Sequence, residues 1–140
     1  MGPQVVPPEY AQKIFKASFL TLISFITAVT LQVWDGAAVT GSVFVCSTNY
    51  WRRPEYGWRR NIDIVNSLTC LAYQTWRSFQ VSAPYMIGFL TPTYFGLGCY
   101  FFSQHHIRTN TVLSARAHVG THFFANVGNV VLYLGLSKQL

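Results

Sequence analysis

Four side chains of this 140-residue sequence, Ser47, Asp63, His118 and His122, have the types and spacing of a small polar site. His118 and His122 are four positions apart, so on a helix they share one face, one turn apart. Asp63 is the acidic residue closest to a predicted membrane-spanning core, and an ionisable residue there is a functional hypothesis by default. Two imidazoles and a carboxylate could hold a zinc ion with an open position, whose bound water would be a nucleophile for hydrolysis. We therefore predict a candidate metal site at His118, His122 and Asp63.

A structural role for the same residues is the alternative. His118 and His122 could hydrogen-bond across helices to Ser, Thr, Asn or backbone oxygens, each contact being worth roughly 0.6 kcal/mol on average. Asp63 could instead form an ion pair. The candidate cations for that pair are Arg59, Arg60 and Arg116. Haem is disfavoured because two histidines on adjacent turns point the same way, so we expect no cofactor unless the zinc interpretation holds.

Two segments resemble the hemolysin III branch of the CREST superfamily of membrane proteins, which includes alkaline ceramidases. The segment that runs from Cys46 to Asp63, CSTNYWRRPEYGWRRNID, resembles that family's Ser-x-x-Tyr-His and Arg-Arg-x-Asp pattern, and HVGTHFFANVGNVVLY, from His118 onward, resembles its His-x-x-x-His segment. The resemblance implies a seven-helix fold, a zinc site of three histidines with Ser47 and Asp63 in supporting roles, and hydrolysis of lipid amides or esters. The sequence departs from the pattern in having Trp51 at the third histidine.

The elements that must position these residues are long apolar runs. Half of the chain is hydrophobic and only 10% is charged, well below the quarter that is typical of soluble chains. Uncharged runs cover residues 17–34, 78–104 and 117–137, with shorter ones at 37–51 and 64–76. The longest three reach roughly 27 to 40 Å as helices, enough to cross a bilayer core of about 30 Å. We predict a single domain over residues 1–140, an all-α polytopic membrane bundle of about five transmembrane helices, two of them short.

Turn residues predict where the helices begin and end. The proline-rich residues 1–10 predict an extended arm, with the first helix beginning near Glu9. Asp35 and Gly36 predict the first turn, and Asn61 or Asp63 is a candidate N-cap of the third helix. Two further prolines in the run 78–104 predict a kink or a late start of that helix. The last helix is expected to begin at 111–116 and end near 138, and small and amide side chains at 126–129 predict a close helix contact.

A basic and aromatic segment at 50–60 separates the second and third runs. Pro54 and Gly57 predict a turn at its centre, and its aromatic rings have the polar tips that favour a membrane interface. Guanidinium groups in such a loop reach anionic head groups, for which cardiolipin is a candidate. The predicted lipid-binding residues are Arg52, Arg53, Arg59, Arg60, Trp51 and Trp58.

In a five-helix topology eight cations fall on one side and two on the other, which predicts that the basic side faces the cytosol or the mitochondrial matrix. The eight are Lys13, Lys16, Arg52, Arg53, Arg59, Arg60, Arg108 and Arg116, against Arg77 and Lys138.

The low content of ionisable residues favours a non-catalytic accessory subunit of a larger membrane complex over an enzyme. Its expected partners are other membrane subunits and anionic phospholipid, with no nucleic acid, since basic loops between apolar runs are typical of membrane topology. We expect a mitochondrial inner membrane setting, in a respiratory-chain or ATP synthase assembly. The alternative is a reduced CREST-like, zinc-dependent hydrolase of lipid amides or esters.

Overall fold

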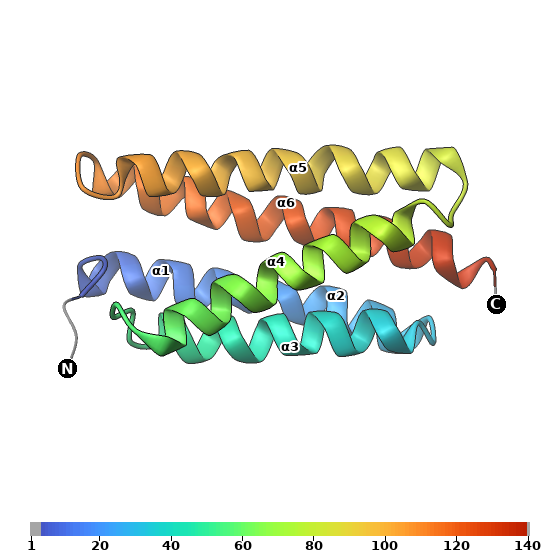
Figure 1. Cartoon of the computed structure of the whole chain (residues 1–140), viewed down its shortest axis with the longest axis horizontal. Coiled ribbons are helices and arrows are strands. Elements are labelled where there is room, and N and C mark those ends of the chain that lie inside the picture. Colours follow the sequence, from blue (N-terminus) through green and yellow to red (C-terminus); the bar gives the residue numbers. More distant parts are fainter. Residues whose placement is uncertain (1–3, 140) are drawn as a thin grey trace.

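The computed structural model describes residues 4–139 as helices that run along one long axis (Figure 1). The helices are α1 (Pro8–Ser18), α2 (Thr21–Thr30), α3 (Trp34–Trp51), α4 (Trp58–Ser78), α5 (Ala83–His106) and α6 (Thr111–Ser137). Only Phe19 and Leu20 separate α1 from α2, so Pro8–Thr30 forms one interrupted helix and the bundle has five rods. The prediction of an all-helical fold with about five helices is confirmed for the described residues.

Two of these stretches, Pro8–Thr30 and Thr111–Ser137, are long and apolar enough to cross a membrane. Length and composition alone give weak evidence of membrane association, because a core helix of a soluble protein can pass the same test. The other rods do not pass it, so five crossings are not established by this measure.

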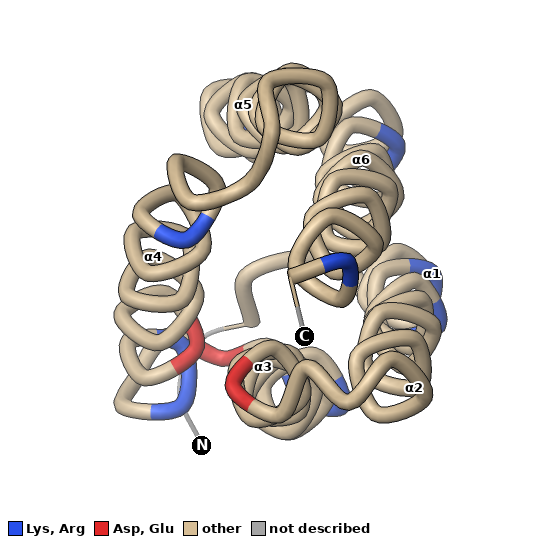
Figure 2. The backbone as a smooth tube through the Cα atoms, turned by 90° about the vertical axis from the view of Figure 1, so that its right-hand side faces the viewer, with Lys and Arg blue, Asp and Glu red and all other residues tan. Residues whose placement is uncertain are grey.

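The rods form a ring when viewed along the bundle axis (Figure 2). Successive rods are antiparallel, and α4 crosses obliquely from α3 towards α5 (Figure 1). The α5 and α6 helices share the most extensive contact, whereas α4 touches α5 only lightly. A Cβ atom on Gly128 would overlap Thr93 Oγ1 and lie 3.0 Å from the Phe89 carbonyl oxygen. The predicted close contact near residue 128 is therefore confirmed, and glycine is what permits it.

The prediction that the first turn lies at Asp35 and Gly36 is wrong. The chain turns at residues 31–33, where Gln32 has a positive φ of 58°, and both predicted turn residues lie in the first turn of α3. Gly36 is instead a packing residue, because a Cβ there would lie 2.6 Å from Cε1 of Tyr133 on α6.

The predicted N-cap of the third helix at Asn61 or Asp63 is also wrong. The α4 helix begins at Trp58, with Gly57 as its N-cap. Gly57 has φ 157° and ψ −165°, a backbone region that is essentially restricted to glycine. The connection is therefore shorter than the predicted 50–60 loop and covers only residues 52–57.

The other predicted helix limits agree with the structure. The first helix begins at Pro8 and the last extends from Thr111 to Ser137. The α5 helix starts late, at Ala83, with one proline in its first turn and Pro92 inside the helix. Residues 4–7 of the predicted arm lie on the 52–57 connection, where the Val5 amide donates to the Pro54 carbonyl at 2.9 Å. Residues 1–3 lie outside the described part of the chain.

The bundle interior is unusually polar. Two buried apolar clusters fill its ends, one around Phe89, Leu132 and Tyr133 and the other around Ile14 and Trp51. Across the described residues the buried side chains are about as often polar as apolar, and many large apolar side chains point outward. The share of polar residues among the buried positions is larger than in a typical soluble domain, whose buried positions are dominated by apolar residues.

Candidate functional site: a histidine-lined polar cavity

Ser47 and Asp63 meet near the basic end of the bundle. Ser47 lies on the last turns of α3 and Asp63 on the second turn of α4, and the short 52–57 connection brings the two helices together. The Ser47 hydroxyl donates to Asp63 Oδ1 at 2.7 Å, and both residues are buried. Within residues 4–139 Asp63 forms no ion pair, while Arg59 pairs with Glu55 at 3.8 Å. The alternative prediction, an ion pair between Asp63 and an arginine, is wrong.

His118 and His122 lie side by side on the inward face of α6. Their ring centroids are 5.4 Å apart, and the residues are 6% and 9% exposed. His118 Nδ1 and His122 Nε2 are buried, and neither finds a hydrogen-bond partner among the described residues. The cross-helix hydrogen bonds expected from a purely structural role are therefore not made by these two atoms. Buried polar atoms without partners are rare in proteins, and each calls for a ligand, an ion or a water molecule.

Trp51 lies against His118, the first histidine of the pair. Its side chain is 4% exposed, and its ring meets the His118 ring edge-on with centroids 4.7 Å apart. Tyr100 of α5 approaches the same imidazole, at 5.9 Å. The position at which the resemblance expects a third histidine thus contacts His118, and it carries an indole ring instead of an imidazole.

One cavity of about 170 Å³ joins these residues. Ser47, Asp63, His118 and His122 all line it, so the structure brings together the four residues that the sequence singled out. It also reaches polar residues that the sequence analysis did not select for a site. These are Thr21, Thr40, Ser67, Gln74, Thr93, Tyr100, Thr121, Asn126 and Asn129.

Hydrogen bonds hold the far part of this cavity in place. Ser24 of α2 donates to Asn126 Oδ1 at 2.5 Å, and the Asn126 amide donates to the His122 carbonyl at 2.7 Å. Gln74 of α4 donates to the Tyr133 hydroxyl at 2.6 Å. In the sequence these residues stand out only as polar residues inside apolar runs. That pattern identifies an interior position but does not identify the hydrogen-bond partner.

The predicted three-donor metal set is not assembled. Across residues 4–139 no group of three or more His, Cys, Asp and Glu side chains is placed to share a metal ion. The two unpartnered imidazole nitrogens are suitable metal donors, but the Asp63 carboxylate is bonded to Ser47 and does not join them. The residues present therefore fit part of a zinc site and lack its third ligand.

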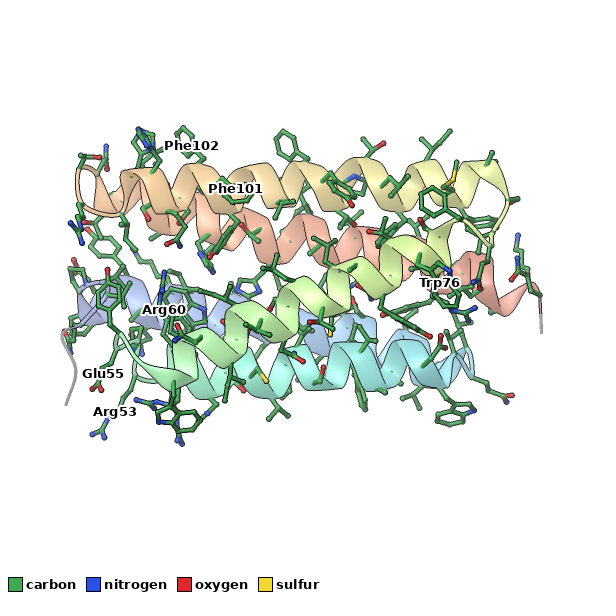
Figure 3. The ribbon with its side chains drawn as sticks, viewed as in Figure 1. Arg53, Glu55, Arg60, Trp76, Phe101 and Phe102 are labelled. Atoms are coloured by element: carbon green, nitrogen blue, oxygen red, sulfur yellow. The ribbon has the colours of Figure 1, made fainter. Side chains whose placement is uncertain are left out.

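The predicted lipid-binding residues separate into exposed and buried members. Arg52, Arg53 and Trp58 are exposed, with Trp58 67% accessible. Figure 3 shows Arg53, Glu55 and Arg60 at one end of the bundle and Trp76 towards the other. The Arg60 guanidinium lies 5.3 Å from the centroid of the Tyr56 ring. Trp51 is the exception, because it packs inside the bundle and does not face outward.

At the opposite end Asp35 joins α3 to α4, a contact that the sequence analysis missed. Asp35 Oδ2 accepts hydrogen bonds from the Tyr73 hydroxyl at 2.8 Å and from Arg77 Nε at 2.7 Å. Partial burial acts to raise the pKa of Asp35, but the Tyr73 hydrogen bond and the Arg77 charge outweigh it, so the pKa lies below its usual 3.8. These contacts, like the one between Ser47 and Asp63, anchor α4.

The chain matches no known protein family, and neither a similar curated protein nor a similar solved structure is found. The functional assignment therefore depends on the geometry of the bundle and its cavity.

Proposed function

We propose that this chain is an integral membrane protein whose five rods all cross the bilayer, acting as a non-catalytic accessory subunit of a larger membrane complex. The observation that carries the proposal is the outward direction of large apolar side chains on every rod. Examples with at least 40% exposure are Ile23 and Ile26 on α2, Val45 on α3, Val65 and Leu68 on α4, Phe95 on α5, and Val127 and Leu134 on α6. Lipid tails or the helices of neighbouring subunits satisfy such faces, whereas water does not.

The distribution of cations supports an orientation. The segments with eight Lys and Arg residues lie at one end of the bundle, where α1, α4 and α6 begin, and Arg77 and Lys138 lie at the other (Figure 1). In the proposed topology the basic end faces the mitochondrial matrix or the cytosol and contacts anionic phospholipid through Arg52, Arg53 and Trp58. A respiratory-chain or ATP synthase assembly of the mitochondrial inner membrane is the proposed setting.

Cysteine labelling tests the topology. In a background with all three native cysteines replaced, single cysteines at Arg53, Thr109 and Ser82 are treated with a membrane-impermeant maleimide in oriented vesicles. We expect Arg53→Cys and Thr109→Cys to label from one side and Ser82→Cys from the other, with the protein resisting carbonate extraction. Labelling of all three from one side, or release by carbonate, would contradict the five-crossing proposal. Cross-linking in native membranes then identifies neighbouring subunits, and isolation of the chain alone would contradict the accessory role.

A second candidate function is zinc-dependent hydrolysis of a lipid amide or ester. The unpartnered nitrogens of His118 and His122, in a cavity shared with Ser47 and Asp63, favour it. Zinc, when bound, would supply a Lewis acid for hydrolysis. His118 and His122 would hold it, and Ser47 would orient the Asp63 carboxylate.

Elemental analysis distinguishes the two candidates. Stoichiometric zinc in the purified protein, lost in both His118→Ala and His122→Ala, would support the hydrolase and lead to assays on lipid amides and esters. A folded preparation that takes up no zinc when the metal is supplied would leave the subunit proposal standing alone. His105→Ala is the matched control, because that histidine lies near the exposed end of α5 and does not line the cavity.

A further inference from the structure

A groove between α1 and α6, about 190 Å³ in volume, lies near the basic end of the bundle and shares no lining residue with the histidine-lined cavity. The two helices are neighbours in the ring and both begin at the same end, so they run parallel (Figure 2). The groove is lined by Tyr10, Lys13, Val112, Ala115, Arg116 and Val119. Buried Ala115 forms its floor.

The two cations of this groove lie at the same depth. Lys13 follows the start of α1 at Pro8 by five residues, and Arg116 follows the start of α6 at Thr111 by five. At about 1.5 Å per residue, both lie roughly 8 Å below the helix ends. Two positive charges from segments about a hundred positions apart in the sequence therefore converge on one site.

Neither cation is neutralised within the described chain. The ion pairs formed by residues 4–139 join Arg59 to Glu55 and Arg77 to Asp35, and involve neither Lys13 nor Arg116. The Lys13 ammonium lies 5.3 Å from the centroid of the Tyr10 ring. Glu9, the acidic residue on α1, does not line the groove.

We propose that this groove binds the phosphate of one anionic phospholipid, with Lys13 and Arg116 on the phosphate oxygens and the Tyr10 hydroxyl at the edge of the head group. Two cations that share one groove fit a phosphate, and basic pockets between membrane helices are a known form of lipid site. The inference rests on the proposed membrane placement, and it names a site that the basic 52–57 connection does not include.

The walls of the groove favour a lipid over free phosphate. Val119 lies about one turn beyond Arg116 on α6, so the groove wall is apolar on the side of the phosphate position that faces the bundle centre, while Val112 lies one turn before Arg116. An acyl chain can follow this surface, whereas a free inorganic ion gains nothing from it.

Native mass spectrometry of the full chain in detergent, with phosphatidylglycerol or phosphatidylcholine added, tests the proposal. We expect wild type to retain phosphatidylglycerol preferentially, and Lys13→Gln with Arg116→Gln to weaken that binding about tenfold or more, since each cation near an anionic surface contributes about 1 kcal/mol. Lys16→Gln with Arg108→Gln removes the same charge from two exposed cations of the basic end that do not line the groove, and is expected to retain most of the binding. Lys13→Arg with Arg116→Lys keeps both charges and should bind like wild type, and helical circular dichroism establishes that each variant is folded.

Three results would overturn the groove assignment. Equal binding of phosphatidylglycerol and phosphatidylcholine by wild type would show that the site does not select an anionic head group. Loss of phosphatidylglycerol binding in a further double variant, Arg52→Gln with Arg53→Gln, while the groove double variant binds like wild type, would move the site to the 52–57 connection. Displacement of the lipid by millimolar inorganic phosphate would identify a site for the free ion. All three leave the proposed membrane topology intact, because that is tested separately by labelling and carbonate extraction.

Discussion

Removing the Tyr133 hydroxyl should loosen α4 without opening a cavity. The ring of Tyr133 is 1% exposed, and its hydroxyl accepts a hydrogen bond from Gln74 Nε2 at 2.6 Å and donates one to the Gly36 carbonyl at 3.2 Å. Tyr133→Phe keeps the ring, so the packing of α6 against Gly36 is retained. What changes is the connection from α6 to α4 and α3.

The expected cost follows from which partner is left without a hydrogen bond. The Gly36 carbonyl still accepts from Thr40 Oγ1 at 2.8 Å, so it is not orphaned. Gln74, which is 6% exposed, loses the acceptor of its amide. In the proposed membrane setting, hydrogen bonds between helices contribute about 0.6 kcal/mol on average and up to about 1.7, so two of them set a range of about 1 to 3 kcal/mol. Because the Gly36 carbonyl keeps its hydrogen bond from Thr40, we expect Tyr133→Phe to destabilise the protein by about 1 to 2 kcal/mol.

Unfolding in mixed micelles of increasing SDS fraction, followed by circular dichroism, measures this loss. Tyr94→Phe is the control, because its hydroxyl meets Thr75 at an exposed position, at 3.2 Å. A double-mutant cycle with Gln74→Leu should give a coupling of at least about 0.5 kcal/mol. Equal losses of stability in Tyr133→Phe and Tyr94→Phe would contradict a stabilising hydrogen bond between Gln74 of α4 and Tyr133 of α6. Strict additivity of the Tyr133→Phe and Gln74→Leu losses would contradict it as well.

Three further predictions concern single positions. Gly57→Ala should cost about 1 to 3 kcal/mol because of its positive φ, whereas Gly98→Ala, in the interior of α5 where a Cβ would meet no atom within 4 Å, should be neutral or stabilise by up to about 1 kcal/mol; thermal unfolding compares the two. Asp35 has a lowered pKa, so its contribution should be complete above pH 3.8 and lost as the pH falls through the lower folded value; wild type should lose more stability than Asp35→Asn on acidification, and parallel pH profiles would contradict this. Gly128→Ala should separate α5 from α6 because its Cβ overlaps Thr93, and disulfide cross-linking between cysteines introduced into α5 and α6 should slow relative to the Gly98→Ala control.

Much of the helix layout could be predicted from the sequence because charges and prolines interrupt the apolar runs. The last helix begins at Thr111 as expected, where the Asn110 side chain accepts from the Leu113 amide. The turn before α3 could not be placed, since Gly36 is required by Tyr133, which lies 97 positions away. A local sequence signal cannot separate a glycine that ends a helix from one that admits a neighbouring ring.

The candidate site was only partly predictable for a related reason. Helix periodicity and topology place His118, His122, Ser47 and Asp63 at one end, and the structure confirms that they line one cavity. Whether each polar atom finds a partner depends on distances of a few tenths of an ångström, which no spacing rule supplies. The Lys13 and Arg116 groove was missed because it depends on α1 lying beside α6, the first and last rods of the chain.

The α4 helix connects stability to the candidate site. Its buried residues include Asp63 and Gln74, while Ile62, Val65 and Trp76 on the same helix are at least 48% exposed. In the proposed membrane setting, the hydrogen bonds of the polar inner face attach α4 to the bundle, while its apolar outer face contacts lipid or a neighbouring subunit. Polar groups that line the cavity therefore also attach α4 to the bundle, so replacing Asp63 by Ala would remove a candidate functional group and a structural contact together.

Asp63→Asn separates the two roles, because its amide oxygen can still accept from Ser47 while the charge is lost. A variant that stays folded but loses ligand or metal binding would assign the carboxylate to function, and a variant that unfolds like Ser47→Ala would assign it to structure.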